Sequence, residues 1–108
     1  MTALTVSEVL AKAADLIEPE GAWSNDDVAR DRAGEMTFAA DPSAVCWCAL
    51  GAIWHASVGT GVNDYLIENA VLRIIEGDSI AAWNDAPGRT QAEVVAALRA
   101  ASAKAGEA

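Results

Sequence analysis

The sequence is short of positive charge. Lysine and arginine account for 7 of its 108 residues, against 16 aspartates and glutamates, so the formal net charge is -9. A surface of this sign repels nucleic-acid phosphates, and no basic run overrides the repulsion, so we expect no direct binding of DNA or RNA. Two interpretations of the acidity stay open: solubility alone, or attraction to a basic protein surface, including one that normally holds nucleic acid.

Metal ligands and catalytic motifs are also scarce. One histidine and two cysteines are too few for a zinc site made of cysteine and histidine alone. Asp26, Asp27 and Asp31 lack the spacing of a calcium loop. The chain has no G-x-S-x-G, Walker loop or H-E-x-x-H motif. We therefore expect no metal and no cofactor.

The two cysteines raise the question of a thiol nucleophile. A Cys-Trp pair near the start of an expected helix is similar to the nucleophile of papain-like enzymes, where the helix dipole favours the thiolate. Those enzymes need a histidine from elsewhere in the fold, and His55 lies about 10 Å beyond Cys48 on the same expected helix. We therefore interpret Cys46 and Cys48 as buried and inert, and we assign no catalytic residue.

No apolar run is long enough to cross a membrane. The most apolar stretch, residues 44–58, is shorter than the roughly 18 to 20 residues that a bilayer requires. The first ten residues show no basic segment followed by an apolar one, so we see no secretory signal. These features predict a cytoplasmic protein without a membrane partner.

Few aromatic residues and many alanines favour helix over sheet. Aromatic residues make up 6% of the chain, and alanine outnumbers the β-branched types. The length suits one domain with its own core. We predict an all-α fold over residues 1–108, a small helical bundle around a buried central helix at about residues 42–58.

The central helix is predicted from apolar residues on every side and from signals at both ends. Asp41 is placed to cap it, Pro42 suits its first turn, and Gly59 suits its end. Trp47 and Trp54 lie seven residues apart, which puts both on one face of a continuous helix.

Helices are also predicted on both sides of this centre. Thr5 with Glu8, and Thr90 with Glu93, have the capping-box spacing and open the first and last helices. Apolar periodicity predicts helices at 6–18, 62–76 and 80–83, with Tyr65 among the inward residues of the second. Leu66 is expected to face inward too, and residues 104–108 form a frayed tail.

Residues 19–41 form an irregular acidic connection. Ser24 or Asn25 could cap a short helical turn there, and residues 36–38 could form a brief extended piece. A connection of this length inside a small domain often carries function. It is therefore one of the two places where we expect a site, through Trp23, Asp26 and Asp27.

The second place is a dense polar turn after the short helix. Trp83, Asn84 and Asp85 precede a Pro-Gly turn that ends at Arg89. One interpretation is that Trp83 fills the core and Asn84 with Asp85 turns the chain. The other is a pocket whose mouth carries the polar groups of Asn84, Asp85 and Arg89, near Trp23 and Trp83.

The motifs Cys48-Ala49-Leu50-Gly51-Ala52, Trp83-Asn84-Asp85 and Arg89-Thr90 with Glu93-Val94 carry a resemblance over most of the chain, from about residue 5 to 103. With the region of Trp23, Arg30-Asp31 and Gly34, they resemble a family of small uncharacterised helical proteins of bacteria and phages. Some members carry a histidine where this chain has Gln91. The resemblance implies a shared helical fold and a bacterial or phage setting, and it brings no activity with it.

Together these features predict a non-enzymatic acidic module that acts through protein contacts. The setting would be a phage, as a virion component or an inhibitor of a host system, or a bacterium, as an accessory protein. The alternative is a small enzyme or ligand-binding protein with the pocket near Trp23 and Trp83. A partner protein is expected, with a basic surface, and a homo-oligomer is left open.

Overall fold

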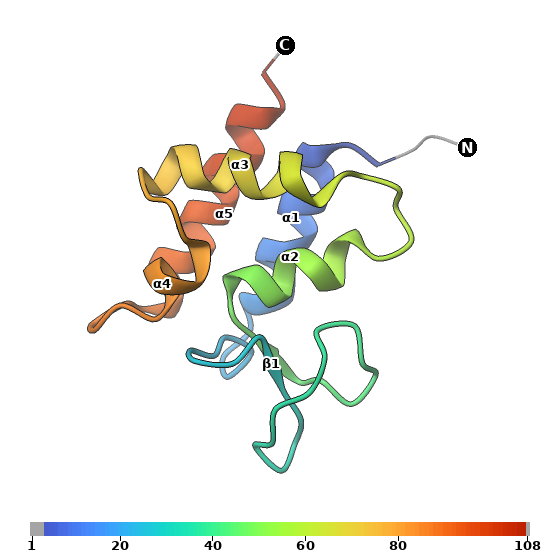
Figure 1. The fold of residues 1–108 in the computed structure, drawn as a ribbon, viewed down its shortest axis with the longest axis vertical. Helices are drawn as coiled ribbons and strands as arrows, with labels where there is room; N and C mark the ends of the chain where they lie inside the picture. The colour runs from blue at the N-terminus through green and yellow to red at the C-terminus, as the bar shows by residue number, and fades with distance from the viewer. Residues whose placement is uncertain (1–3, 108) are drawn as a thin grey trace.

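The computed structural model describes residues 4–107, which form five helices and one two-stranded sheet (Figure 1). Their bounds are α1 Val6–Ile17, β1 Ala29–Arg30, β2 Cys46–Trp47, α2 Ala49–Ser57, α3 Asp64–Ile75, α4 Ile80–Asn84 and α5 Gln91–Ala105. About half of the chain is helical and the whole is one compact domain, so the expectation of a helical domain is confirmed. The expectation of a purely α fold is wrong, because of the sheet.

Helix α1 packs chiefly against α5 and α2. The two capping boxes predicted at Thr5 and Thr90 are both present, with each threonine accepting from the backbone N–H three residues on. The apolar faces of these helices supply much of the core, in which Leu10 and Leu98 are fully buried. Local capping and apolar periodicity therefore account for this part of the fold.

The central helix is shorter than predicted. α2 begins at Ala49, and its cap is Cys48, whose Sγ accepts from the N–H of Gly51 at 3.3 Å. Asp41 instead closes a turn by accepting from the N–H of Ser43 at 2.8 Å. An apolar run can form a buried strand as well as a buried helix, and here the first part of the run enters the sheet.

The shift from helix to strand separates two tryptophans that were expected to share a face. Trp47 lies on β2 and is 7% exposed, whereas Trp54 lies on α2 and is 37% exposed. The indole N–H of Trp47 donates to the carbonyl of Ala39 at 2.9 Å, which fixes the loop before β2. Trp47 is therefore a core residue and Trp54 a surface residue.

The 19–41 connection is organised by backbone pairing around the sheet. β1 pairs antiparallel with β2, Trp23 bridges to Trp47 on one side of the sheet, and Arg30 bridges to Met36 on the other. The helical turn expected after Ser24 or Asn25 is absent from this segment, where Asp26 adopts a φ of 73° instead. Figure 1 shows this region as loops around β1 at one end of the molecule, beyond the helices.

Helices α3 and α4 lie close to their predicted positions, and Asn63 and Ser79 cap them. The expected inward orientation of Tyr65 and Leu66 is wrong, since they are 68% and 57% exposed. The buried face of α3 is centred on Ile67 and Val71, which lie one turn apart. Tyr65 and Leu66, the first two apolar residues of the helix, lie outside that face. Among the described residues, every helix is too short or too polar to span a bilayer.

Candidate functional site

Some of the predicted site residues meet around one buried amide. Asn84 has no exposed surface, and its Oδ1 accepts from the indole N–H of Trp23 at 2.8 Å and from the backbone N–H of Ala49 at 3.0 Å. Its Nδ2 donates to the carbonyl of Ser24 at 3.2 Å. One side chain thus joins α4, the first turn of α2 and the segment before β1, regions far apart in the sequence.

The neighbours of Asn84 are also engaged. Asp85 accepts from Asn84 Nδ2 at 3.0 Å and from the N–H of Asp26 at 2.8 Å. The guanidinium of Arg89 lies 4.0 Å from the centre of the Trp83 ring, and its Nε donates to the carbonyl of Trp83 at 2.9 Å. The bond from Asp26 to Asp85 joins the turn after α4 to the segment before β1, and the Arg89–Trp83 contacts close the turn on itself.

Asp27 also turns away from the Asn84 amide, as Trp83 and Arg89 do in packing on each other. The Asp27 carboxylate pairs with Arg30 at 2.8 Å, beside the start of β1. Among the described residues, no buried polar side-chain atom is left without a hydrogen-bond partner. The pocket hypothesis stays a prediction, while the contacts of Trp23, Asn84 and Asp85 give these residues a structural role.

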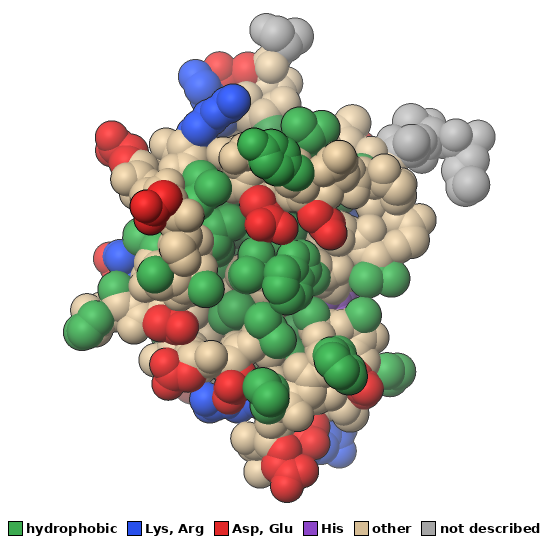
Figure 2. All heavy atoms as spheres, viewed as in Figure 1, with side chains coloured by type: hydrophobic (Ala, Val, Ile, Leu, Met, Phe, Trp, Pro, Cys, Tyr) green, Lys and Arg blue, Asp and Glu red, His purple; other side chains and the backbone are tan. Residues whose placement is uncertain are grey.

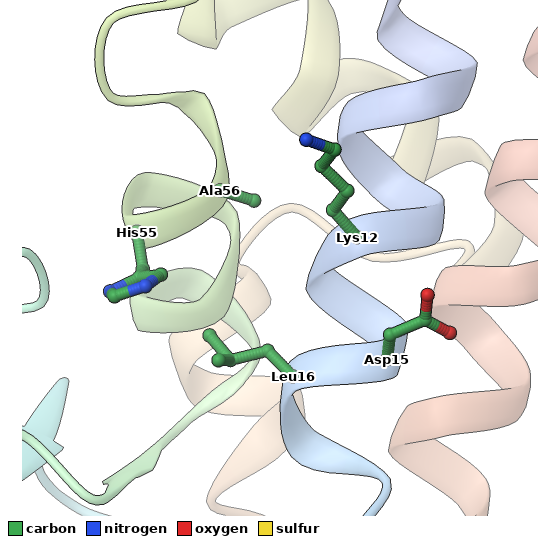
Figure 3. A pocket seen from close by; sticks show the side chains of 5 residues that line it. All are labelled: Lys12, Asp15, Leu16, His55 and Ala56. Carbon is green, nitrogen blue, oxygen red and sulfur yellow. The ribbon is translucent and has the colours of Figure 1, made fainter.

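A shallow groove lies between α1 and α2, and Figure 3 shows the side chains that line it. Leu16 points between the two helices, but the His55 ring turns away from α1, and Asp15 points toward α5. His55 Nδ1 lies 2.8 Å from the carbonyl of Ala39, and Asp15 pairs with Arg99 at 2.9 Å. The polar groups of the groove do not converge, so the groove offers no acid–base pair.

The cysteines lie in different surroundings. Both are free, Cys46 is half-buried, and Cys48 is buried at the start of α2. Burial raises the pKa of the Cys48 thiol, and the N–H of Gly51, which donates to its sulfur, opposes that shift without cancelling it. The expectation that both cysteines are buried is confirmed for Cys48 and wrong for Cys46, and the raised pKa of Cys48 is consistent with an inert thiol.

Sequence reasoning missed two exposed apolar surfaces. The first, which we name the corner patch, lies where α2 ends and α3 begins and consists of Trp54, Val58 and Tyr65. Leu66 is exposed as well, but it lines a separate hollow beside α5 with Arg73 and Lys104. In Figure 2, hydrophobic side chains extend across the middle of the face, with carboxylates among them and lysine and arginine near the edges. Large apolar residues gathered on a surface are typical of a contact site.

The second surface lies beside β1. Met36 and Phe38 are 71% and 81% exposed, although Phe38 is the only phenylalanine in the chain. The expected extended piece at residues 36–38 places Met36 and Phe38 on the same face, so the two side chains should be buried together or exposed together. The sequence did not indicate which of the apolar residues would face solvent.

Comparisons with known proteins give one finding. Neither the curated proteins nor the solved structures include a match to this chain. The model of one family matches residues 1–104 and is described as a family of unknown function. That match covers nearly the whole chain, and the protein therefore belongs to the family of unknown function DUF6197.

Proposed function

We propose that this protein is a non-enzymatic, acidic protein-binding module whose contact site is the corner patch. The observation that carries the proposal is the exposure of Trp54, Val58 and Tyr65 where α2 ends and α3 begins, in a chain with only 6% aromatic residues. Tryptophan and tyrosine are enriched at the energetic centres of protein interfaces. The setting that we propose is a bacterial accessory protein or a phage protein, either a virion component or an inhibitor of a host system.

The patch is held in shape before any partner arrives. The indole N–H of Trp54 donates to Glu68 Oε2 at 3.2 Å, which links the outer faces of α2 and α3. Asn63 caps α3 just before Tyr65, so the first turn of that helix is fixed as well. A fixed apolar surface loses less conformational freedom on binding than a mobile one does, which favours association.

Charge determines the kind of partner. Asp64 and Glu68 lie beside the apolar residues on α3, and the whole chain carries a net charge of -9. A second copy of the chain would bring the same charge to the interface and be repelled. A basic protein surface with apolar residues at its centre fits best, so we propose a partner of that kind.

The pocket alternative has no comparable observation in its favour. The polar atoms of Trp23, Asn84 and Asp85 that could face a ligand are engaged by one another or by the backbone. The exposed aromatic residues lie on the other surfaces described above. Protein binding through the corner patch is therefore the function that the geometry supports best.

The test uses two matched variants in affinity capture from a bacterial host, followed by calorimetry with each purified partner. Tyr65→Ser removes an exposed aromatic ring from the corner patch, and Phe38→Ser removes one from the surface beside β1. We expect the partner's affinity to fall at least about tenfold with Tyr65→Ser, as for a central interface residue, and to stay unchanged with Phe38→Ser. Affinity should also decrease as salt rises. A partner held equally well by the Tyr65→Ser variant, with no dependence on salt, would contradict the proposal.

A further inference from the structure

The segment at residues 35–37 forms the outer edge of the small sheet. The N–H of Thr37 donates to the carbonyl of Ala29 at 3.0 Å, and the N–H of Asp31 donates to the carbonyl of Glu35 at 2.9 Å. Between these two bonds, Met36 faces Arg30 as an antiparallel bridge. Residues 35–37 therefore lie along one side of β1, and β2 lies along the other.

This pairing leaves the backbone of Met36 open. In an antiparallel pair, a residue flanked by two inward bonds directs its own N–H and C=O away from the neighbouring strand. Within residues 4–107, neither group of Met36 has a hydrogen-bond partner. An uncovered edge of this kind can pair with another extended chain.

Apolar side chains flank the open edge. Met36 and Phe38 are 71% and 81% exposed, and both line a hollow with Val28, Thr37 and Asp41. The carbonyl of Ala39 is held by Trp47 Nε1 at 2.9 Å and lies 2.8 Å from His55 Nδ1, which fixes the chain directly after Phe38. The edge and the hollow beside it are thus preformed.

The negative charge around the edge favours a positively charged segment as its binding partner. Residues 26–41 contain five carboxylates and two arginines. One of the arginines, Arg30, is already paired with Asp27. A second copy of the chain would bring its own carboxylates to this edge, whereas lysine or arginine in an added segment would be attracted.

We infer that this edge accepts an extended segment of a partner protein by strand addition, with lysine or arginine alternating with apolar residues. The backbone of Met36 supplies one donor and one acceptor, the hollow beside Phe38 takes an apolar side chain, and the carboxylates attract the basic ones. The surface is separate from the corner patch, so this inference does not depend on the function proposed for that patch.

A peptide titration tests the inference directly. The probe is a heptapeptide of alternating lysine and valine, added to isotope-labelled protein and followed by the shifts of backbone amide resonances. We expect the largest shifts at Met36, Thr37 and Phe38. A version N-methylated at its central valine should bind about five to ten times more weakly, because one backbone hydrogen bond is lost. A glutamate–valine version should not bind.

Variants of the protein complete the test. Met36→Pro removes the outward N–H but keeps the two inward bonds, which belong to Thr37 and Glu35. Phe38→Ser keeps the backbone and removes the ring, so it decides the question even if the proline variant does not fold. We expect both to weaken the lysine–valine peptide at least about fivefold, while Tyr65→Ser leaves it unchanged. Equal binding of the methylated peptide, binding of the glutamate peptide, or shifts confined to the corner patch would overturn the inference.

Discussion

The helical layer and the segment at residues 22–47 are held together in different ways. α1 and α5 meet through apolar faces, and Val9, Leu10, Val94 and Leu98 are fully buried between the helices. The 22–47 segment buries few large side chains apart from Trp47. It is held by backbone pairing and by the amide of Asn84, which reaches it from α4.

The helical layer therefore supplies most of the stability, and the 22–47 segment supplies open surface for contacts. Apolar burial across a helix pair continues to act when one hydrogen bond is lost, because each side chain contributes separately. A segment held by a few directional bonds depends on each of them, and it leaves its outer atoms free for other contacts. The open edge at Met36 belongs to the second region, and the predictions below test whether the two regions respond separately.

The largest effect is expected at the point where the regions touch. A Cβ on Gly51 would collide with the carbonyl of Val28, which is rigid backbone and also accepts from the N–H of Cys48 at 3.2 Å. Gly51→Ala should lower the free energy of unfolding by about 4 kcal/mol or more, measured by chemical denaturation. Gly77→Ala is the matched control, since its Cβ would meet nothing closer than 3.7 Å. Equal stability of both variants would show that the two regions are not in rigid contact.

A smaller loss is expected for the buried amide. Asn84→Ala leaves the indole N–H of Trp23, the N–H of Ala49 and the carbonyl of Ser24 without their partner. We expect a loss of about 3 kcal/mol and faster hydrogen exchange in residues 22–30, with α1 and α5 still protected.

The control for that variant makes the same truncation at a surface position. Asn63→Ala removes an exposed helix cap and should cost about 1 kcal/mol. Uniform loss of protection across α1, α5 and residues 22–30 in the Asn84→Ala protein would mean that the two regions unfold as one unit.

The next prediction concerns the helical layer alone. Gln91 Nε2 donates to the carbonyls of Ile17 and Pro19, each at 2.7 Å, and so closes the C-terminal end of α1. Gln91→Ala should cost about 1 kcal/mol, without faster exchange in residues 22–30. Gln91→His keeps a ring N–H that can donate to the same carbonyls and should lose less. Gln91→Glu presents only acceptors and should lose more. If all three variants are as stable as the unmodified protein, the hydrogen bonds of Gln91 contribute nothing to stability.

The sequence predicted the helical layer better than the 22–47 segment. The capping boxes at Thr5 and Thr90 depend on residues three positions apart, and both were predicted correctly. Trp47 was placed in a helix because an apolar run fits helix and strand equally well. Its position in β2 depends on pairing with Ala29, a contact 18 positions away. Local rules do not contain that information.

The candidate site divides in the same way. Trp23, Asn84 and Asp85 were identified because polar residues beside tryptophans are conspicuous in a mostly apolar sequence, and the structure does bring them together. The exposure of Tyr65 and Phe38 was missed. Whether an apolar side chain is buried depends on which elements cover it, and only the assembled domain determines that.

The smallest effect is expected at two exposed carboxylates, one in each region. The N–H of Ser43 lowers the pKa of Asp41, and the N–H of Thr90 lowers the pKa of Glu93, with smaller help from the hydroxyls and from Arg89. Because each folded pKa is depressed, the stability that each carboxylate adds is present above its unfolded pKa of about 4 and is lost as pH falls through the folded pKa. Glu93→Gln and Asp41→Asn should each reduce the acid dependence of unfolding, and carboxyl resonances should titrate below their usual range.

Hydrogen exchange shows whether the two carboxylates act separately. On acidification, faster amide exchange should begin in the first turn of α5 when Glu93 is protonated and in residues 38–45 when Asp41 is protonated, because each carboxylate bonds within its own region. A simultaneous onset in both places would argue against independent regions.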